Sequence, residues 1–322
     1  MRVALDVSPL RLTRAGSARY VEGLKRELPE HVELRELGWG GSGRATAALR
    51  DAVWYPLGLR RAARGSDVLH CPTFRAPLSS RVPMVVTVLD LAVLRHPELF
   101  NRWNRTYSRL TVPRVVRAAR RVIAISEFTK GELMELLGVD PARVTVIGIP
   151  PLGTLSPDGP RAEGDYVLAV GTLEPRKNLE RAAEAAVRAG VELRVVGARG
   201  WGGVSPNGVR WLGEVGDDEL TQLLRGARAL VYPSLYEGFG IPILEAMSVG
   251  TPVVTSRGGA TEEVAGGAAV LVDPLDPASI AAGIDDADRR RVELRALGLA
   301  RARSFSWDDV GRQTVQVYEE AL

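Results

Sequence analysis

Short apolar runs rich in β-branched residues alternate with amphipathic stretches along the whole chain. Such runs are typical of buried parallel strands, and the stretches between them have the spacing of helices. We expect strands at 2–8, 32–37, 67–72, 84–90, 121–126 and 144–149, and again at 166–171, 193–197, 209–212, 229–233, 252–256 and 269–273. This alternation predicts an α/β fold with two doubly wound, Rossmann-like domains.

The boundary between the domains is predicted where proline and glycine accumulate, at 148–164. We therefore expect an N-terminal domain at 1–150, a linker at 151–164 and a second domain from 165. Ligands of doubly wound sheets bind at the carboxyl ends of the strands. Candidate residues at such ends are Asp90, Gly171, Gly197 and Glu237.

The stretch 229–256 combines a strand, a glycine-bearing loop, a short helix and another strand. Gly238 and Gly240 allow close approach of the backbone to a ligand, and Pro242 suits a first helical turn. Gly250 suits the left-handed residue after a helix. A helix N-terminus behind such a loop favours an anion, so the pattern fits a phosphate-bearing, hydroxyl-rich ligand such as a nucleotide sugar.

Two blocks of sequence resemble the retaining GT-B glycosyltransferases of group 1, also called family four, which include mannosyltransferases and glucosyltransferases. Glu237 and Glu245, within EGFGIPILEAM, match the family's E-x7-E signature. The block 171–178, GTLEPRKN, is similar to its diphosphate-binding motif. The resemblance covers the C-terminal half and, more weakly, most of the N-terminal half.

The resemblance implies a GT-B fold in which two Rossmann-like domains face a cleft, an acceptor-binding one at 1–150 and a nucleotide-sugar-binding one at 165–305. It also implies that the last helix, 306–322, crosses back to the N-terminal domain. The implied activity is transfer of a hexose from a nucleoside diphosphate sugar, of the GDP-mannose or UDP- or ADP-glucose type, to a hydroxyl acceptor such as a glycan or lipid-linked glycan.

The resemblance also implies the site residues. The candidate catalytic residues are Arg176, Lys177, Glu237 and Asp90, and the candidate donor-binding residues are Gly16, Gly171, Gly197, Gly238, Phe239, Gly240 and Glu245. Arg176 and Lys177 would stabilise the leaving diphosphate, Glu237 would hold sugar hydroxyls and Glu245 the ribose. No metal or other cofactor is expected, because the cationic pair can do what Mg²⁺ does elsewhere.

The sequence departs from the family pattern at two positions. Leu89 stands where the family has a histidine that touches the transferred sugar, and Gly16 stands without the usual second glycine beside it. His70 and His96 are nearby in the sequence, but a lone histidine is more often a structural hydrogen-bonding residue.

Charge is distributed unevenly along the chain. Residues 1–160 hold 24 Lys and Arg against 15 Asp and Glu (net +9), whereas residues 161–322 hold 18 against 24 (net −6). A basic helix with seven arginines and flanking Trp103 and Tyr107 is expected at 101–121, where Pro113 could kink or divide it. This segment fits either an anionic membrane surface or a solvated surface helix.

Composition excludes several other classes of protein. No apolar run reaches the roughly 18 residues of a membrane-spanning helix, and the first ten residues lack the zones of a signal peptide. These two absences, together with the single cysteine, Cys71, predict that the protein is located in the cytoplasm, including the inner face of the membrane. No lysine precedes Ser or Thr, so a P-loop is absent, and three histidines with one cysteine leave no zinc cluster.

Two short motifs are not expected to function, and nucleic acid is not an expected partner. The glycines of 38–43 match G-x-G-x-x-G but follow the second strand, so we interpret them as a loop. The D-x-D at 286–288 lies in a charged helical stretch and is interpreted as solvated surface.

The alternatives to a transferase are a nucleotide-sugar 2-epimerase of the same fold, and a non-catalytic two-domain sugar-binding protein, which would need an export signal.

Overall fold

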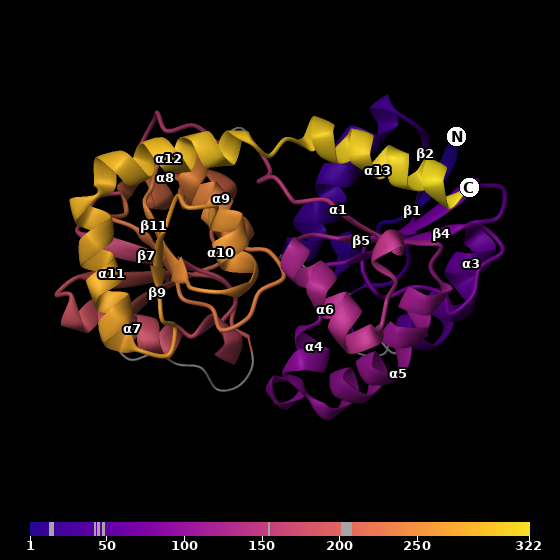
Figure 1. Ribbon diagram of the computed structural model, residues 1–322, viewed down its shortest axis with the longest axis horizontal. Helices are drawn as coiled ribbons and strands as arrows, with labels where there is room; N and C mark the ends of the chain where they lie inside the picture. Colours follow the sequence, from indigo (N-terminus) through magenta and orange to yellow (C-terminus); the bar gives the residue numbers. More distant parts are fainter. Residues whose placement is uncertain (13–15, 42, 44–45, 47–48, 154, 201–207) are drawn as a thin grey trace. The chain divides into compact units, whose positions relative to one another are not determined.

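The structure is a computed structural model that describes residues 1–322 except 13–15, 42, 44–45, 47–48, 154 and 201–207. The chain forms two compact units. One contains residues 1–149 together with 306–322, and the other contains residues 150–305. Residues 151–164, expected as a linker, therefore count with the second unit. Each unit is a parallel sheet with helices (Figure 1).

The first unit has a six-stranded sheet in the order β2-β1-β3-β4-β5-β6. The strands are β1 (Arg2–Asp6), β2 (Glu33–Leu37), β3 (Val68–Cys71), β4 (Met84–Val88), β5 (Arg121–Ala124) and β6 (Val144–Val146). The helices include α1 (Gly16–Glu27), α3 (Leu59–Ala62), α4 (Ala92–Arg95), α5 (Arg102–Ala118), α6 (Glu127–Leu137) and α13 (Trp307–Ala321). All neighbouring strands are parallel, as the alternation of strands and helices predicts.

The second unit repeats this plan with the strand order β12-β11-β10-β7-β8-β9. Its strands are β7 (Tyr166–Val170), β8 (Glu192–Val196), β9 (Val209–Gly213), β10 (Leu230–Tyr232), β11 (Val253–Ser256) and β12 (Val270–Val272). Its helices are α7 (Leu179–Arg188), α8 (Asp217–Gly226), α9 (Ile241–Ser248), α10 (Gly259–Ala265), α11 (Pro277–Arg289) and α12 (Arg291–Arg303). Every predicted strand is therefore found, and the α/β fold class is confirmed.

The structure bears on two helix predictions. The helix expected at 45–63 is found in the described residues: Thr46 and Leu49 are helical, a π-helix runs over Arg50–Gly58 and α3 follows it directly, whereas 45, 47 and 48 lie outside the described residues. Pro56 lies in the π-helix; it has no N–H to donate and would clash with the preceding turn of a regular α-helix. Pro113, by contrast, does not divide α5, which continues through it to Ala118.

The last helix, α13, belongs to the first unit and packs on α1, β4 and β5 (Figure 1). Gly23 makes this contact close, because a Cβ there would meet the ring of Trp307 at 2.0 Å. Buried hydrogen bonds add to the apolar contact. His70 on β3 bonds the hydroxyl of Tyr318 through Nδ1 (2.7 Å) and that of Thr87 through Nε2 (2.9 Å).

The neutral form of His70 is part of this packing. Its side chain is fully buried, and burial lowers the pKa of His70 from 6.5 to about 3. A neutral imidazole can donate from one nitrogen and accept at the other, which suits two hydroxyl partners. His70 is therefore a structural residue between β3 and α13.

The pH dependence of stability tests this role. The unfolded chain protonates His70 below about pH 6.5, whereas the folded chain stays neutral down to about pH 3. The free energy of unfolding should therefore fall as the pH is lowered through this window, by up to about 1.4 kcal/mol per pH unit from this group. Urea unfolding at pH 7, 6 and 5 should show a shallower fall for His70→Gln than for the wild type.

The comparison with His70→Gln isolates this single group. Asp6 is also fully buried, and burial raises its pKa to about 6, which acts in the opposite direction between pH 6 and 4. Because Asp6 is present in both proteins, its effect cancels in the difference. Parallel pH profiles for the two proteins would contradict a neutral, buried His70.

Candidate active site

The carboxyl ends of β7 and β8 bring two predicted glycines into contact. Gly171 and Gly197 have φ angles of +150° and +152°. A Cβ on Gly197 would lie 2.0 Å from the carbonyl oxygen of Gly171, so no other residue fits there. Without a Cβ, these glycines leave their backbone uncovered by a side chain at the carboxyl ends of the strands, where doubly wound folds bind ligands.

Beside these glycines lies a buried ion cluster that joins two loops. Glu237, in the loop after β10, accepts from Arg176 Nη1 at Oε2 (2.7 Å) and from Lys177 Nζ at Oε1 (2.6 Å). The Tyr232 hydroxyl donates to Oε1 at 2.9 Å and accepts from Lys177 Nζ at 2.7 Å. Arg176 Nη2 also pairs with Glu174, which is 2% exposed. We call Glu174, Arg176, Lys177, Tyr232 and Glu237 the ion cluster.

Burial and charge determine the protonation states in the ion cluster. Burial alone would raise the pKa of Glu237, but the charges of Arg176 and Lys177 outweigh it and lower the pKa to about 2. Burial lowers the pKa of Lys177, although the charge of Glu237 opposes this. Glu237 is therefore an ionised carboxylate, and two cations are held in a largely water-excluded position. Such cations interact strongly with an anionic ligand.

The backbone around the ion cluster is held by Asn178. This residue has a left-handed conformation (φ 58°) directly before α7, which begins at Leu179 as expected. Its amide donates to the carbonyl oxygens of Pro233 (2.9 Å) and Pro274 (2.6 Å). The loop after β7 is thereby tied to the ends of β10 and β12, which fixes the position of Arg176 and Lys177.

The predicted loop–helix unit at 237–248 is also present. Gly240 has a φ of +119° and directly precedes α9, with Pro242 in its first turn. Phe239 is buried and its ring packs edge-on against Phe305. Glu245 lies on α9 and is 4% exposed, so any ligand would reach it only at the inner end of a site.

Of the predicted residues in this unit, the structure brings Arg176, Lys177 and Glu237 into direct contact, with Gly171 beside Lys177 and Gly197 beside Gly171. The assignment of donor-binding and catalytic roles to them stays a prediction. Sequence analysis missed Tyr232 and did not assign roles to Glu174 and Asn178. The one sequence feature that indicates Tyr232 is its place at the end of a strand, before a glycine-bearing loop.

Gly16 and Asp90 lie in the other unit. Gly16 is the exposed first residue of α1, next to residues outside the described part. Asp90 follows β4 and accepts a hydrogen bond from the backbone N–H of Ala92 at 3.1 Å, which positions it at the start of α4. Their roles stay predictions. Leu89 stands where the family has a histidine, and the contacts of the two nearby histidines do not indicate that either replaces it. His70 has a structural role, and His96 Nδ1 lies 3.4 Å from Glu98 Oε1.

A second group of buried polar atoms lies at the carboxyl end of β1 and was missed by sequence analysis. Asp6 Oδ1 accepts from the N–H (3.1 Å) and the hydroxyl (2.6 Å) of Ser8. Asp6 Oδ2, Arg50 Nε and Nη1 and the Tyr55 hydroxyl are buried without hydrogen-bond partners among the described residues. Buried polar atoms of this kind usually bond to water or a ligand. They can therefore receive a water molecule or a substrate hydroxyl.

Metal-binding groups are scarce in the described part of the chain. One group of three side chains, Glu27, His31 and Asp308, has ligand atoms within 4.8 Å of one another. It belongs to the first unit, where Asp308 also pairs with Arg312 at 3.1 Å. In the D-x-D at 286–288, Asp286 pairs with Arg289 and Arg290 instead.

None of the described helices combines the length and apolar character needed to cross a bilayer.

Comparison with known proteins places both units in glycosyltransferase families. The model of the family described as "Glycosyl transferases group 1" matches residues 164–287, and that of "Glycosyltransferase Family 4" matches residues 15–149. O-antigen chain mannosyltransferase B of Escherichia coli is 32% identical over 285 residues, which cover 78% of this chain and 74% of that protein.

A second relative and a solved structure are also similar to this chain. MMP alpha-(1->4)-mannosyltransferase of Mycolicibacterium hassiacum is 33% identical over 238 residues, covering 65% of this chain but only 56% of that protein. The structure of Anabaena HepE in complex with UDP-glucose superposes with a TM-score of 0.76 at 19% identity, covering 99% of both chains. This structural similarity confirms the GT-B fold.

The ion cluster makes a prediction about stability. Replacing Glu237 by Gln keeps its shape but leaves two buried cations without this counter-charge, which should lower the free energy of unfolding by roughly 3 kcal/mol or more. Adding Lys177→Met should recover part of this loss, because one of the uncompensated cations is removed. Urea unfolding of the wild type, both single variants and the double variant measures this coupling.

The matched control is a solvent-exposed pair in the same unit. Glu184 and Arg188 are 2.8 Å apart with side chains about half exposed (53% and 50%). Glu184→Gln should change the free energy of unfolding by less than about 0.5 kcal/mol. If Glu237→Gln were as mild as this control, the buried cluster would not contribute as its geometry indicates.

Proposed function

Because this chain belongs to the group 1, family four glycosyltransferases, we propose that it moves a hexose from a nucleoside diphosphate sugar to a hydroxyl of a glycan or lipid-linked glycan, with retention and without a metal ion. That it is a sugar-transferring enzyme follows from the family. The proposal of donor and mechanism rests on the pair of largely buried cations, Arg176 and Lys177, that follow the carboxyl end of β7.

The cations match the charge that develops in the reaction. As the bond between the anomeric carbon and the β-phosphate oxygen breaks, negative charge accumulates on the leaving diphosphate. The acceptor hydroxyl forms the new bond to the same carbon, and its proton passes to a leaving phosphate oxygen. Preorganised cations stabilise such a developing charge, and this is the contribution that Mg²⁺ makes in metal-dependent sites.

The state of Glu237 supports retention without a covalent intermediate. Each of its carboxylate oxygens accepts hydrogen bonds from charged or hydroxyl donors, and its pKa is about 2. A carboxylate held in this way is a weak nucleophile, so Glu237 is better suited to orient sugar hydroxyls. We propose that acceptor and leaving group react on one face of the sugar. The anomeric configuration of the product, read by NMR, tests the retention that this route requires.

The identity of the donor is proposed from the relatives. Two relatives are named as mannosyltransferases, and the HepE structure contains UDP-glucose. GDP-mannose and UDP-glucose are therefore the first donors to screen by thermal shift, followed by ADP-glucose. Transferase relatives also favour sugar transfer over the 2-epimerase and binding-protein alternatives, and an epimerase would turn over without an acceptor.

Three substitutions separate the proposed roles. Arg176→Ala should lower kcat by roughly 100-fold or more, because a preorganised donor to a developing anion is lost. Glu237→Gln should impair transfer but spare affinity for the free nucleoside diphosphate, and Glu245→Ala should weaken the nucleotide itself. Titration of each variant with the diphosphate and with the intact donor measures both effects. Equal loss of diphosphate affinity in Glu237→Gln and Arg176→Ala would refute this division.

Metal independence is tested by exhaustive chelation. Turnover should be unchanged after treatment with EDTA and dialysis, since Arg176 and Lys177 carry the compensating charge. The control is re-addition of Mg²⁺ or Mn²⁺, which should have no effect. Complete loss of activity restored by either ion would show that a metal is required.

We also propose that α5 binds an anionic membrane surface, which would bring the enzyme to a lipid-linked acceptor. Trp103 and Leu110 are 64% and 51% exposed and lie seven residues apart, so they share one stripe of the helix. Exposed arginines surround this stripe at positions 102, 105, 109, 114 and 117. Apolar side chains rimmed by cations are typical of helices that lie at a lipid interface.

Vesicle sedimentation at low salt tests this proposal. The protein should sediment with vesicles containing phosphatidylglycerol and be released as salt rises, because the charge attraction is screened. Arg105→Gln with Arg109→Gln should weaken binding by about five-fold per arginine. The charge-matched control is Arg188→Gln with Arg303→Gln, both exposed elsewhere. Equally weak binding to neutral and anionic vesicles would mean that α5 is an ordinary solvated helix.

A further inference from the structure

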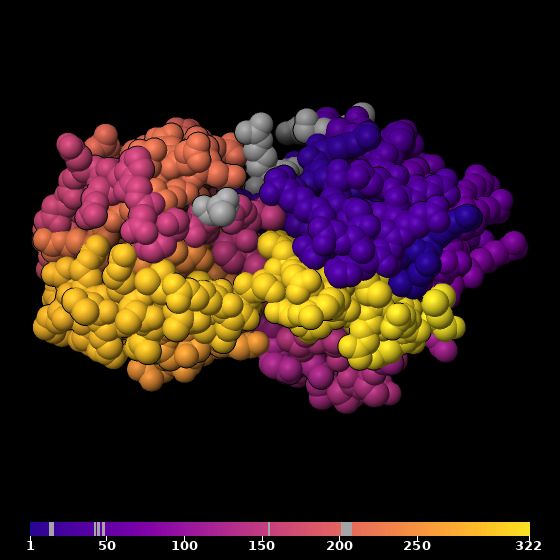
Figure 2. Space-filling view, turned by 90° about the horizontal axis from the view of Figure 1, so that it is seen from above, coloured from indigo at the N-terminus to yellow at the C-terminus, as the bar shows by residue number. Residues whose placement is uncertain are grey.

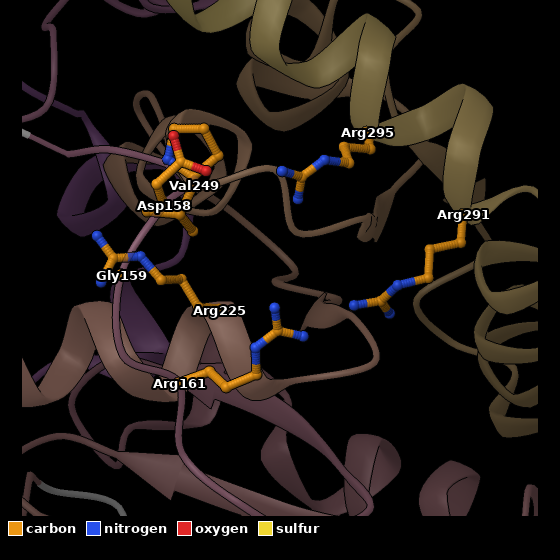
Figure 3. A pocket seen from close by; sticks show the side chains of 8 residues that line it. Asp158, Gly159, Arg161, Arg225, Val249, Arg291 and Arg295 are labelled. Carbon is orange, nitrogen blue, oxygen red and sulfur yellow. The ribbon is translucent and has the colours of Figure 1, made fainter.

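A pocket of about 260 Å³ in the second unit is lined mainly by arginines (Figure 3). Its lining residues are Pro157, Asp158, Gly159, Arg161, Arg225, Val249, Arg291 and Arg295. The guanidinium groups of Arg161, Arg291 and Arg295 turn toward a common space. Four cations and one carboxylate thus surround a single small volume.

This pocket is at the opposite end of the sheet from the ion cluster. Arg225 lies at the end of α8, and Val249 directly follows α9; each therefore precedes a strand, β10 or β11. The ion cluster instead follows the carboxyl ends of β7 and β10. In a parallel sheet, positions before the strands and positions after them lie at opposite ends of the strands. The pocket is therefore separate from the proposed donor site.

The arginines of the pocket are not neutralised by the protein. In the part of the chain that the structure describes, no salt bridge joins any of the four to a carboxylate. Arg225 Nε instead donates to the carbonyl oxygen of Ser156 (2.9 Å), and Arg291 Nη1 to that of Arg228 (2.8 Å). Arg161 and Arg295 are exposed and make no hydrogen bond to another of the described residues. Two of the four cations are therefore available to a ligand.

The position of these cations is electrostatically unfavourable without a counter-ion. Burial lowers the pKa of Arg291, and the nearby charges of Arg295 and Arg161 lower it further, although Asp288 opposes them. Arg291 begins α12 and Arg295 is one turn further on, at the end where a helix carries partial positive charge. Basic side chains are disfavoured there. α12 lies at the surface of the unit, so an anion from solution can reach this end (Figure 2).

We propose that this pocket binds a compact phosphate-bearing anion at a second site, independent of sugar transfer. Guanidinium groups match phosphate oxygens in bidentate geometry, so the arginines that line this pocket suit such an anion. The volume is below the range of about 300–1,000 Å³ usual for larger ligands, so it suits one or two phosphate groups rather than a whole nucleotide. The phosphate can come from a free metabolite or from a lipid headgroup.

Titration with inorganic phosphate tests the site. Isothermal calorimetry should show binding to the wild type that is about ten-fold or more weaker in Arg161→Gln with Arg295→Gln, since two charge-assisted contacts are lost. Arg188→Gln with Arg303→Gln removes the same charge elsewhere and should bind as the wild type does. Asp158→Asn should bind several-fold more tightly, because a carboxylate that repels phosphate is removed.

Two measurements distinguish loss of this site from unfolding and from binding at the ion cluster. In phosphate-free buffer the Arg161→Gln, Arg295→Gln protein should melt no lower than the wild type, because repulsion among the arginines is relieved. Phosphate should raise the melting temperature of the wild type more than that of this variant. If phosphate binding survives in this variant but is lost in Arg176→Ala, the anion occupies the ion cluster and the proposal is wrong. Unchanged binding in Asp158→Asn together with unchanged binding in the double variant would also overturn it.

The source of the phosphate is resolved with vesicles. If a lipid headgroup is the ligand, phosphatidylglycerol vesicles should retain the wild type better than the double variant, and free phosphate should compete. If the ligand is a free metabolite, both proteins should sediment alike while the calorimetric difference remains. Either result supports a second anion site and leaves the proposed transferase activity as a separate question.

Discussion

The candidate active site depends on one physical constraint: a buried carboxylate, Glu237, must be compensated by two cations that come from another loop. Burying any one of these charges alone would cost several kcal/mol, so the three are stable only together. Their meeting depends on strand order, because β10 and β7 are neighbours in the sheet although about sixty residues separate them. Asn178 then ties the loop after β7 to the ends of β10 and β12.

This arrangement has a consequence for ligand binding. In the structure Arg176 and Lys177 are already paired with carboxylates, so a diphosphate does not meet free cations but shares them with Glu237 and Glu174. The free energy needed to bury and position these charges is thus already included in the stability of the folded protein, and the site is organised before a ligand binds. Preorganisation of this kind is what makes electrostatic stabilisation of a developing charge effective.

The distribution of arginine shows why net charge is an incomplete guide to partners. The N-terminal half carries a net charge of +9, and α5 presents its arginines to solvent as the sequence suggests. The C-terminal half carries −6, yet it contains the arginine-lined pocket. Its lining residues come from four separate segments, and only folding brings them together. Glu293, which lies between Arg291 and Arg295 in the sequence, pairs with Arg290 instead.

The sequence by itself determined the fold class, the strands and the identity of the family. Apolar strands buried on both faces have a pattern that local residues set, and Gly171, Pro242, Asn178 and Gly250 occupy the conformations that their own chemistry favours. The blocks 171–178 and 237–245 likewise carry the resemblance within short segments. These features depend on residues close together in the chain, so they could be read from it.

Only the tertiary structure decided which polar groups are partners. It pairs Glu237 with Arg176, Lys177 and Tyr232, and it places His70 against Tyr318, 248 residues away. It also widens the helix expected at 45–63 into a π-helix over Arg50–Gly58, where Pro56 lies. The physical reason is that hydrogen bonds and ion pairs act over a few ångströms, whatever the separation in sequence. Strand order and loop contacts therefore decide them, and neither is encoded in a local pattern.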